Sequence, residues 1–172
     1  MKNRFMQTTV GTFLALLMLF GGTQLVSAQD GEGKERSKER SLEGVWRVTI
    51  TPRNCVTGVP IPTAAFASLF TFHKGGTLSV SLQNSTITIT RSPSHGLWQR
   101  EHGGGDYSFK FVHIRFDLAT SAFLASQVAR GTLRLSESGD EFTTNSSTTS
   151  FDVHGVSIPG MGCSNAVGTR FE

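Results

Sequence analysis

The chain has 172 residues, of which 16 are basic, 13 are acidic and two are cysteines, with a formal net charge of +3. Residues 1–28 hold two of the basic residues and none of the acidic ones, so the remainder carries a net charge of +1. Binding to nucleic acid normally requires a clustered excess of Lys and Arg. The sequence after residue 28 has no such cluster, which argues against nucleic acid as a partner.

The first 28 residues have the pattern of a secretory signal peptide. Lys2 and Arg4 precede the apolar run 12–20, and Val26-Ser27-Ala28 fits a small-residue cleavage site. The apolar run is shorter than the roughly 20 residues that span a bilayer, and we expect no transmembrane segment once the signal is removed. The sequence therefore predicts a protein exported to the periplasm or the extracellular space.

The next segment, 29–41, mixes both charges and contains no apolar residue. Such a composition cannot bury a core, so we interpret it as a disordered charged tether. The remaining residues, 42–172, are enough for one domain with a hydrophobic core of its own.

From Gly44 onward, polar and apolar residues alternate with a period of two, which is typical of half-buried β-strands. Gly-rich or Ser-rich turns separate the runs, and Gly75-Gly76 has the form of a tight hairpin. No convincing helical period is present, apart from a turn near 63–67. Nine strand-like runs follow, at 44–52, 68–73, 77–83, 86–91, 96–102, 106–117, 123–136, 141–153 and 164–171.

The two cysteines favour a closed barrel over a sandwich. Cys55 follows the first run and Cys163 precedes the last, and an exported pair is expected to be oxidised. If the two lie directly opposite each other, Val48 faces Arg170 and Trp46 faces Glu172. Antiparallel closure needs an even number of strands, so one run, most simply 86–91, should lie outside the barrel. The predicted fold is an all-β, antiparallel, up-and-down barrel of about eight strands, closed by its first and last strands.

Gly44 and Trp46 on the first run, the long connection 53–67 and Arg170 on the last run together resemble the calycin pattern of lipocalins. The resemblance implies that Trp46 and Arg170 close the base of the barrel. It also implies that the first connection forms a lid and that the interior holds a small, usually apolar ligand. We expect two differences from lipocalins, namely no helix after the last run and a disulfide that joins the end strands. The fragments TPRNC, FTFHKGG, RSP, REHG and GTRF also resemble those of small secreted bacterial proteins of unassigned function.

An aromatic cluster, with a few polar groups among it, is the best candidate for a ligand pocket. In a small barrel such residues either fill the core or form the wall of a pocket. The candidate pocket residues are Phe70, Phe72, Trp98, Tyr107, Phe109, Phe111, Arg100 and His113. Val112, Ile114 and Phe116 lie on the other face of the same run, which indicates either a β-bulge or an apolar outer patch that could form a homodimer.

Catalytic, metal and cofactor sites have little support in the sequence. Two histidines on neighbouring runs, among His95, His102 and His113, could meet Glu101 or Asp106 around zinc, but none of them has a recognised ligand spacing. No cofactor motif and no acid–base pair stands out. We therefore expect a secreted barrel that binds a small hydrophobic or amphipathic molecule without catalysis. The alternatives are an interaction module with a solid core that dimerises or docks on an envelope partner, and a barrel isomerase or cyclase.

Overall fold

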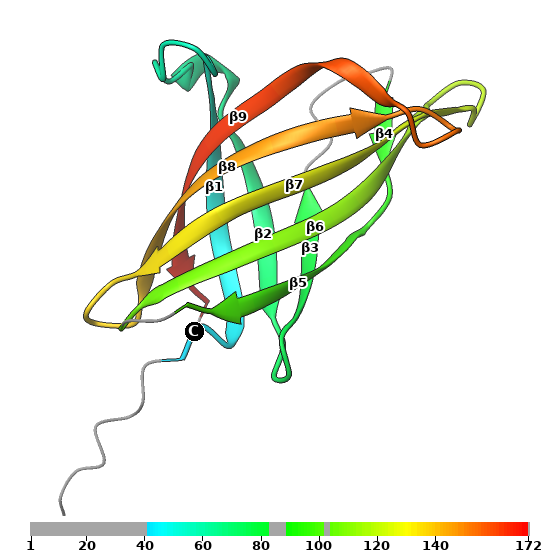
Figure 1. The fold of residues 1–172 in the computed structure, drawn as a ribbon. Helices are drawn as coiled ribbons and strands as arrows, with labels where there is room; N and C mark the ends of the chain where they lie inside the picture. The colour runs from blue at the N-terminus through cyan, green and yellow to red at the C-terminus, as the bar shows by residue number, and fades with distance from the viewer. Residues whose placement is uncertain (1–40, 83–88, 102–103, 172) are drawn as a thin grey trace, which may run out of the picture. The chain divides into compact units, whose positions relative to one another are not determined.

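The structure, a computed structural model, describes residues 41–82, 89–101 and 104–171. The predicted signal peptide and almost all of the predicted tether lie outside these residues. The regular secondary structure of the described residues is β-strand apart from one short 3₁₀ helix, η1 (Pro62–Ala64), as the sequence predicted (Figure 1). The strands are β1 (Gly44–Arg53), β2 (Phe66–Phe72), β3 (Thr77–Leu82), β4 (Ile89–Arg91), β5 (Ser94–Arg100), β6 (Asp106–Asp117), β7 (Phe123–Leu135), β8 (Glu141–Phe151) and β9 (Ser157–Arg170).

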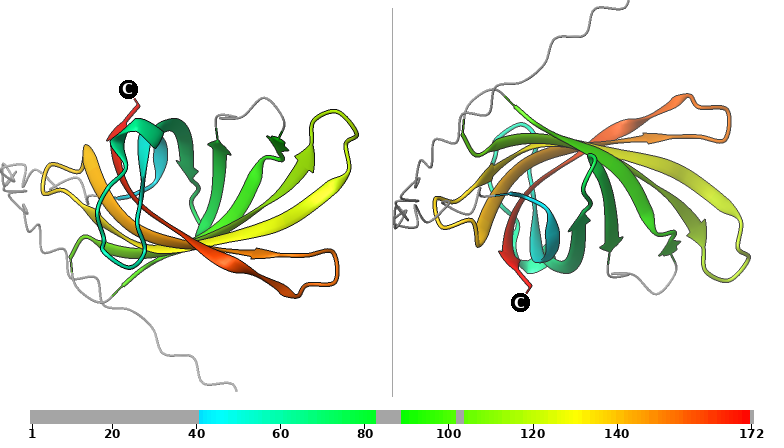
Figure 2. Two further views of the ribbon diagram at one scale, coloured as in Figure 1. Left: turned by 90° about the horizontal axis from the view of Figure 1, so that it is seen from above. Right: turned by 90° about the horizontal axis from the view of Figure 1, so that it is seen from below.

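Eight of these strands form a closed, wholly antiparallel barrel. Each pairs with the next in the order β1-β2-β3-β5-β6-β7-β8-β9, and β9 pairs back with β1. Figure 2 shows the sheet curling around from β1 to β9. We call the end where β1 begins the base of the barrel, and the end where β1 stops the mouth.

The remaining strand, β4, is the one that the sequence analysis placed outside the barrel. It pairs with residues 115–117 of β6, along the same edge of β6 that pairs with β5 nearer the base. Pro93 separates β4 from β5, and a proline has no N–H to donate to a ladder. β4 is therefore a short extension of the β5 edge near the mouth. Residues 86–88 of the predicted run lie outside the described residues.

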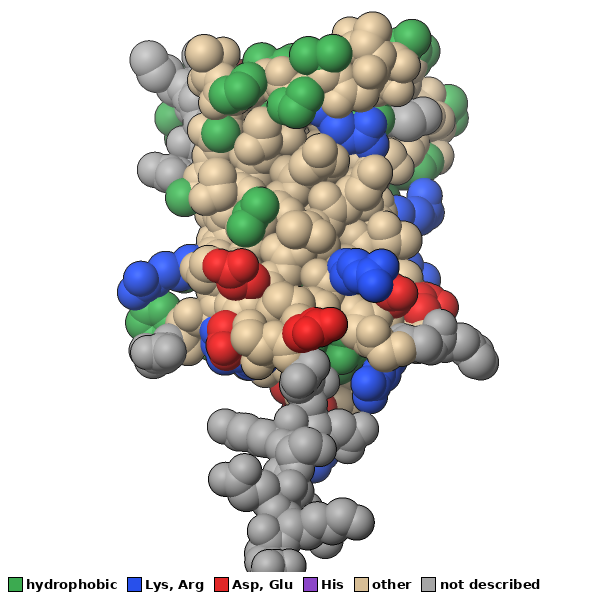
Figure 3. Space-filling view, turned by 90° about the vertical axis from the view of Figure 1, so that its left-hand side faces the viewer, with side chains coloured by type: hydrophobic (Ala, Val, Ile, Leu, Met, Phe, Trp, Pro, Cys, Tyr) green, Lys and Arg blue, Asp and Glu red, His purple; other side chains and the backbone are tan. Residues whose placement is uncertain are grey.

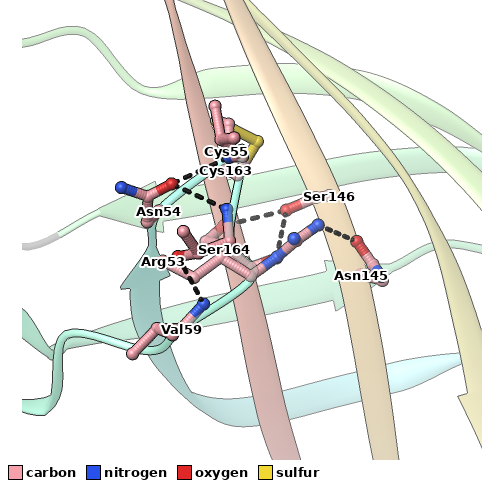
Figure 4. Close-up of a disulfide and its surroundings, with 10 residues drawn as sticks. Arg53, Asn54, Cys55, Val59, Asn145, Ser146, Cys163 and Ser164 are labelled. Atoms are coloured by element: carbon pink, nitrogen blue, oxygen red, sulfur yellow. Dashed lines mark hydrogen bonds between the residues drawn. A yellow bond between two sulfur atoms is a disulfide. The ribbon is translucent and has the colours of Figure 1, made fainter.

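The predicted pairing between the first and last strands was wrong by two residues. Trp46 pairs with Arg170, Val48 with Gly168 and Arg53 with Cys163, where the sequence analysis expected Val48 opposite Arg170 and Trp46 opposite Glu172. The error came from placing the two cysteines directly opposite each other. Cys55 instead lies in the turn after β1 and forms the disulfide with Cys163 diagonally, across a Cα–Cα distance of 5.3 Å (Figure 4).

The last strand is also longer than predicted. β9 begins at Ser157 rather than at 164, and it forms with β8 a long hairpin whose register shifts between Thr149 and Ser150. Pro159 and Gly160 interrupt the alternating pattern at this point, and the irregular pairing accommodates them. The hairpin carries the β8–β9 turn to the mouth.

The base of the barrel is closed by Trp46 and Arg170. The guanidinium of Arg170 lies 4.3 Å from the centre of the Trp46 ring, and it donates hydrogen bonds to the backbone carbonyls of Ser41, Glu43 and Gly139 at 2.7–3.0 Å. Gly44 has φ +126°, and a Cβ there would lie 3.0 Å from a guanidinium nitrogen of Arg170. Glycine therefore suits this position both for its backbone angle and for the space it leaves.

Candidate functional site

A cavity of about 360 Å³ lies inside the barrel on the mouth side. The base side is filled instead, because Trp46, Phe72, Leu78 and Phe142 are almost fully buried there and their aromatic rings pack together. The barrel is thus solid in one half and hollow in the other. A volume of this size lies at the lower end of the range typical of small-molecule pockets.

Three phenylalanines separate the cavity from the solid base. The ring of Phe70 makes edge contacts with Phe109 and Phe111, at centroid distances of 6.5 and 5.9 Å, and all three side chains line the cavity. Their alternation along β2 and β6 directs them inward. Ala129 and Ala166 also line the cavity, and their small side chains leave the space open.

The predicted pocket residues divide into two groups. Phe70, Phe109, Phe111 and His113 line the cavity. The other four do not line it. Phe72 and Tyr107 are buried on the base side, where each makes a ring contact with the partly buried Trp98. Arg100 is exposed at the end of β5 nearest the base.

Hydroxyl groups on β8 and β9 form a wall that the sequence analysis missed. None of the Thr and Ser residues of this region was among the predicted pocket residues. The inward face of β8 starts with the buried Phe142, and the same alternation brings four hydroxyl residues to the cavity. Continuing that alternation from Phe142 would have identified them from the sequence. The hydroxyl residues of the wall are Thr144, Ser146, Thr148, Ser150 and Ser164.

His113 begins a short hydrogen-bonded chain beside the cavity. Its Nε2 lies 3.0 Å from Oε1 of Gln127, whose Nε2 donates to the hydroxyl of Ser150 at 2.9 Å. Burial, with a further contribution from the nearby positive charge of Arg91, lowers the pKa of His113 to about 4. The imidazole is therefore neutral at pH 7. With Nε2–H bonded to Gln127, the buried Nδ1 is an acceptor without a partner among the described residues.

Two arginines lie close to His113 at the mouth. Arg91 on β4 and Arg115 on β6 are direct cross-strand partners, and Arg91 lines the cavity. Burial and the charge of Arg115 both lower the pKa of Arg91. Nε of Arg115 is buried and has no hydrogen-bond partner among the described residues. The polar side of the cavity thus carries concentrated positive charge.

The connections at the mouth present apolar side chains to solvent. These exposed residues are Val56, Val59 and Ile61 between β1 and β2, Leu118 between β6 and β7, and Val153 and Val156 between β8 and β9. On the face that Figure 3 shows, hydrophobic side chains gather at the upper end of the barrel and acidic side chains lie toward the lower end. None of residues 54–65 lines the cavity, so the first connection does not form the lid that the lipocalin resemblance implied.

The groups considered for zinc in the sequence analysis have other neighbours. Glu101 accepts a hydrogen bond from Gln99, Asp106 lies 3.9 Å from Arg134, and His95 is exposed on β5; His102 lies outside the described residues. Within the described part of the chain, no group of three or more His, Cys, Asp or Glu side chains is arranged to hold a metal ion. That part also contains no helix long and apolar enough to cross a bilayer.

Comparison with known proteins returned no matching family model, no similar curated protein and no similar solved structure.

Proposed function

We propose that this chain is an exported, lipocalin-like barrel that binds a small amphipathic molecule in the cavity at its mouth, without catalysis. The observation that carries the proposal is the cavity itself, which has aromatic rings as its floor and a polar side wall within a barrel closed at the base. Small-molecule sites typically combine an apolar lining with a few convergent polar groups. The apolar rim of the mouth is consistent with a ligand that is poorly soluble in water.

The lipocalin-like character of the proposal is supported by the base of the barrel. The contact between Trp46 and Arg170, together with Gly44 two residues before the tryptophan, is what the resemblance implied for closure. The diagonal disulfide and the first connection, which does not cover the cavity, differ from the pattern. The proposal therefore rests on the closed base and the hollow mouth rather than on a lid.

Export is supported by the bond between Cys55 and Cys163, since disulfides persist in oxidising compartments. The predicted signal peptide supplies the route. Intact-mass analysis of the protein recovered outside the cytoplasm should give a chain that begins near Gln29 and has no free thiol. A chain that keeps its first 28 residues would contradict export by this signal.

Filling the cavity tests the binding proposal directly. Ala129→Phe places a ring in the hollow half, and we expect binding of a neutral fluorescent probe such as Nile red to fall at least tenfold. The matched control is Ala67→Phe, because Ala67 is exposed on β2, outside the barrel. Native mass spectrometry of the purified wild type would report any ligand that copurifies. Equal probe binding by Ala129→Phe and wild type, with both folded, would refute the cavity as the binding site.

A second candidate function is supported by the outer surface of β6 and β7. Val112, Ile114 and Leu124 are exposed there, and the pairing of these strands shifts register between Arg115 and Phe116. Such a stripe favours a homodimer or docking on another protein. Sedimentation velocity should then give a dimer that Ile114→Lys converts to a monomer. A wild-type monomer across the accessible concentration range would argue against the homodimer.

A further inference from the structure

The pairing of Arg91 with Arg115 is unusual for two neighbouring strands. Like charges directly opposite each other in an antiparallel pair are destabilising. Here Arg91 lines the cavity, and the β4–β6 register pairs it with Arg115, which does not itself line the cavity. The ion pairs Arg134–Asp106 and Arg170–Asp140 involve other arginines. Among the residues that the structure describes, no Asp or Glu side chain forms an ion pair with Arg91 or Arg115.

Burial increases the cost of this arrangement. Arg91 is half-buried and lines the cavity, and Nε of Arg115 is buried without a hydrogen-bond partner. A buried cation loses hydration and needs a compensating partner. Contact with the ring of Phe66, whose centroid is 5.9 Å from the Arg91 guanidinium, offers only partial compensation.

We propose that Arg91 and Arg115 receive the anionic end of the ligand, a carboxylate, while its apolar chain lies on the phenylalanine floor. This inference rests on the proposed function and names the chemical class of the ligand. Guanidinium groups match the geometry of a carboxylate and can donate two parallel hydrogen bonds to it. A carboxylate between the two arginines removes their repulsion and supplies an acceptor for the unpartnered Nε of Arg115.

The test compares three probes by isothermal titration calorimetry with the full exported chain. Dodecanoate has the apolar chain and the charge, 1-dodecanol has the chain alone, and acetate has the carboxylate alone. We expect dodecanoate to bind with at least about tenfold higher affinity than dodecanol, because hydrogen bonds to a charged group are stronger than those between neutral groups. Acetate should bind far more weakly than dodecanoate, because it lacks the apolar chain.

Each outcome separates this inference from the proposed function. If dodecanoate and dodecanol bind equally well, the cavity binds amphiphiles but the carboxylate site is refuted. If acetate binds as tightly as dodecanoate, the arginines form a site for small anions, and the inference that the ligand is an amphiphile is refuted. If none of the three binds, the proposed function itself fails, and this inference fails with it.

Variants locate the site. Arg91→Gln and Arg115→Gln should each reduce dodecanoate affinity about tenfold and leave dodecanol affinity unchanged, which also reports that the cavity is still folded. The matched control is Arg130→Gln, because Arg130 is exposed on β7 opposite Lys110 and forms a like-charged pair outside the barrel. If Arg130→Gln lost the same amount of dodecanoate affinity, the preference for dodecanoate would come from the net charge of the protein. The assignment of the carboxylate site to Arg91 and Arg115 would then be refuted.

Discussion

At the scale of single residues, Arg170 contributes more interactions to the base than any other side chain described above. Its guanidinium donates to carbonyls that come from two distant parts of the chain, Ser41 and Glu43 before β1 and Gly139 between β7 and β8. The same group covers the Trp46 ring, whose Nε1 donates to the carbonyl of Leu42 at 2.9 Å. One cation therefore joins the entry to β1, the β7–β8 turn and β9.

Replacing that cation should destabilise the barrel. For Arg170→Gln we expect the free energy of unfolding to fall by about 2–4 kcal/mol, since several carbonyls lose a charged donor and Trp46 loses its cover. The measurement is the urea midpoint at a constant m-value. Arg134→Gln serves as the control, because its ion pair is long and exposed and should contribute less than about 0.5 kcal/mol. Equal midpoints for Arg170→Gln and wild type would contradict the account of the base.

His113 should make the stability depend on pH. Its pKa is about 4 in the folded chain and near 6.5 when solvated, so between these values only the unfolded chain takes up the proton. The free energy of unfolding is then highest above about pH 6.5 and falls as the pH decreases toward 4, by about 2–3 kcal/mol from this group. Urea midpoints at pH 7 and pH 4.5 should differ less in His113→Gln than in the wild type. An identical difference in the two proteins would contradict the buried, neutral imidazole.

At the scale of elements, the contact between β1 and β9 decides whether the sheet is open or closed. Their ladder extends from Trp46–Arg170 to Arg53–Cys163, and the disulfide holds its mouth end. Beside the disulfide, Arg53 donates to Asn145 on β8 at 2.6 Å, so β1 is also joined to the strand beyond β9 (Figure 4). The side-chain links of Arg170 and the disulfide lie at opposite ends of the same ladder.

Removing the disulfide should cost more stability than removing most single side chains. The cysteines are 108 residues apart, and a cross-link that closes a loop of about this length is worth about 4–5 kcal/mol in the chain-entropy model. We expect the double variant Cys55→Ser/Cys163→Ser to lose an amount of this order in urea unfolding. Dithiothreitol should destabilise the wild type and leave the double variant unchanged. An equal effect of the reductant on both proteins would contradict a stabilising disulfide.

At the scale of the whole molecule, the alternating pattern, the turn residues and the positions of the two cysteines were together sufficient to predict the barrel from the sequence. Most strand ends agree to within two residues, and the extra strand was recognised because closure requires an even number. The register of the closing strands was not predictable in this way. A disulfide limits the distance between two Cα atoms and does not require its cysteines to be direct partners, as Cys55 and Cys163 demonstrate.

The cavity was predictable only in part. Alternation along β6 correctly put Phe109, Phe111 and His113 on one face, but it could not say at what height the interior changes from solid to hollow. That height depends on which residues meet across the barrel. At the base Phe142 fills the interior, whereas toward the mouth Ala129 and Ala166 leave space. Such pairings depend on the registers of several strands together, which no single run of sequence contains.

The ladder between β1 and β9 also has a consequence for self-association. A closed barrel hides the backbone donors and acceptors of its end strands, which otherwise form a template for pairing with another chain. β9 is a long strand, and β8 beside it is rich in Thr and Ser, with few charges to discourage such pairing. The Arg170 contacts and the disulfide stabilise the two ends of this ladder. Opening of the ladder would expose two strand edges through which separate copies could pair.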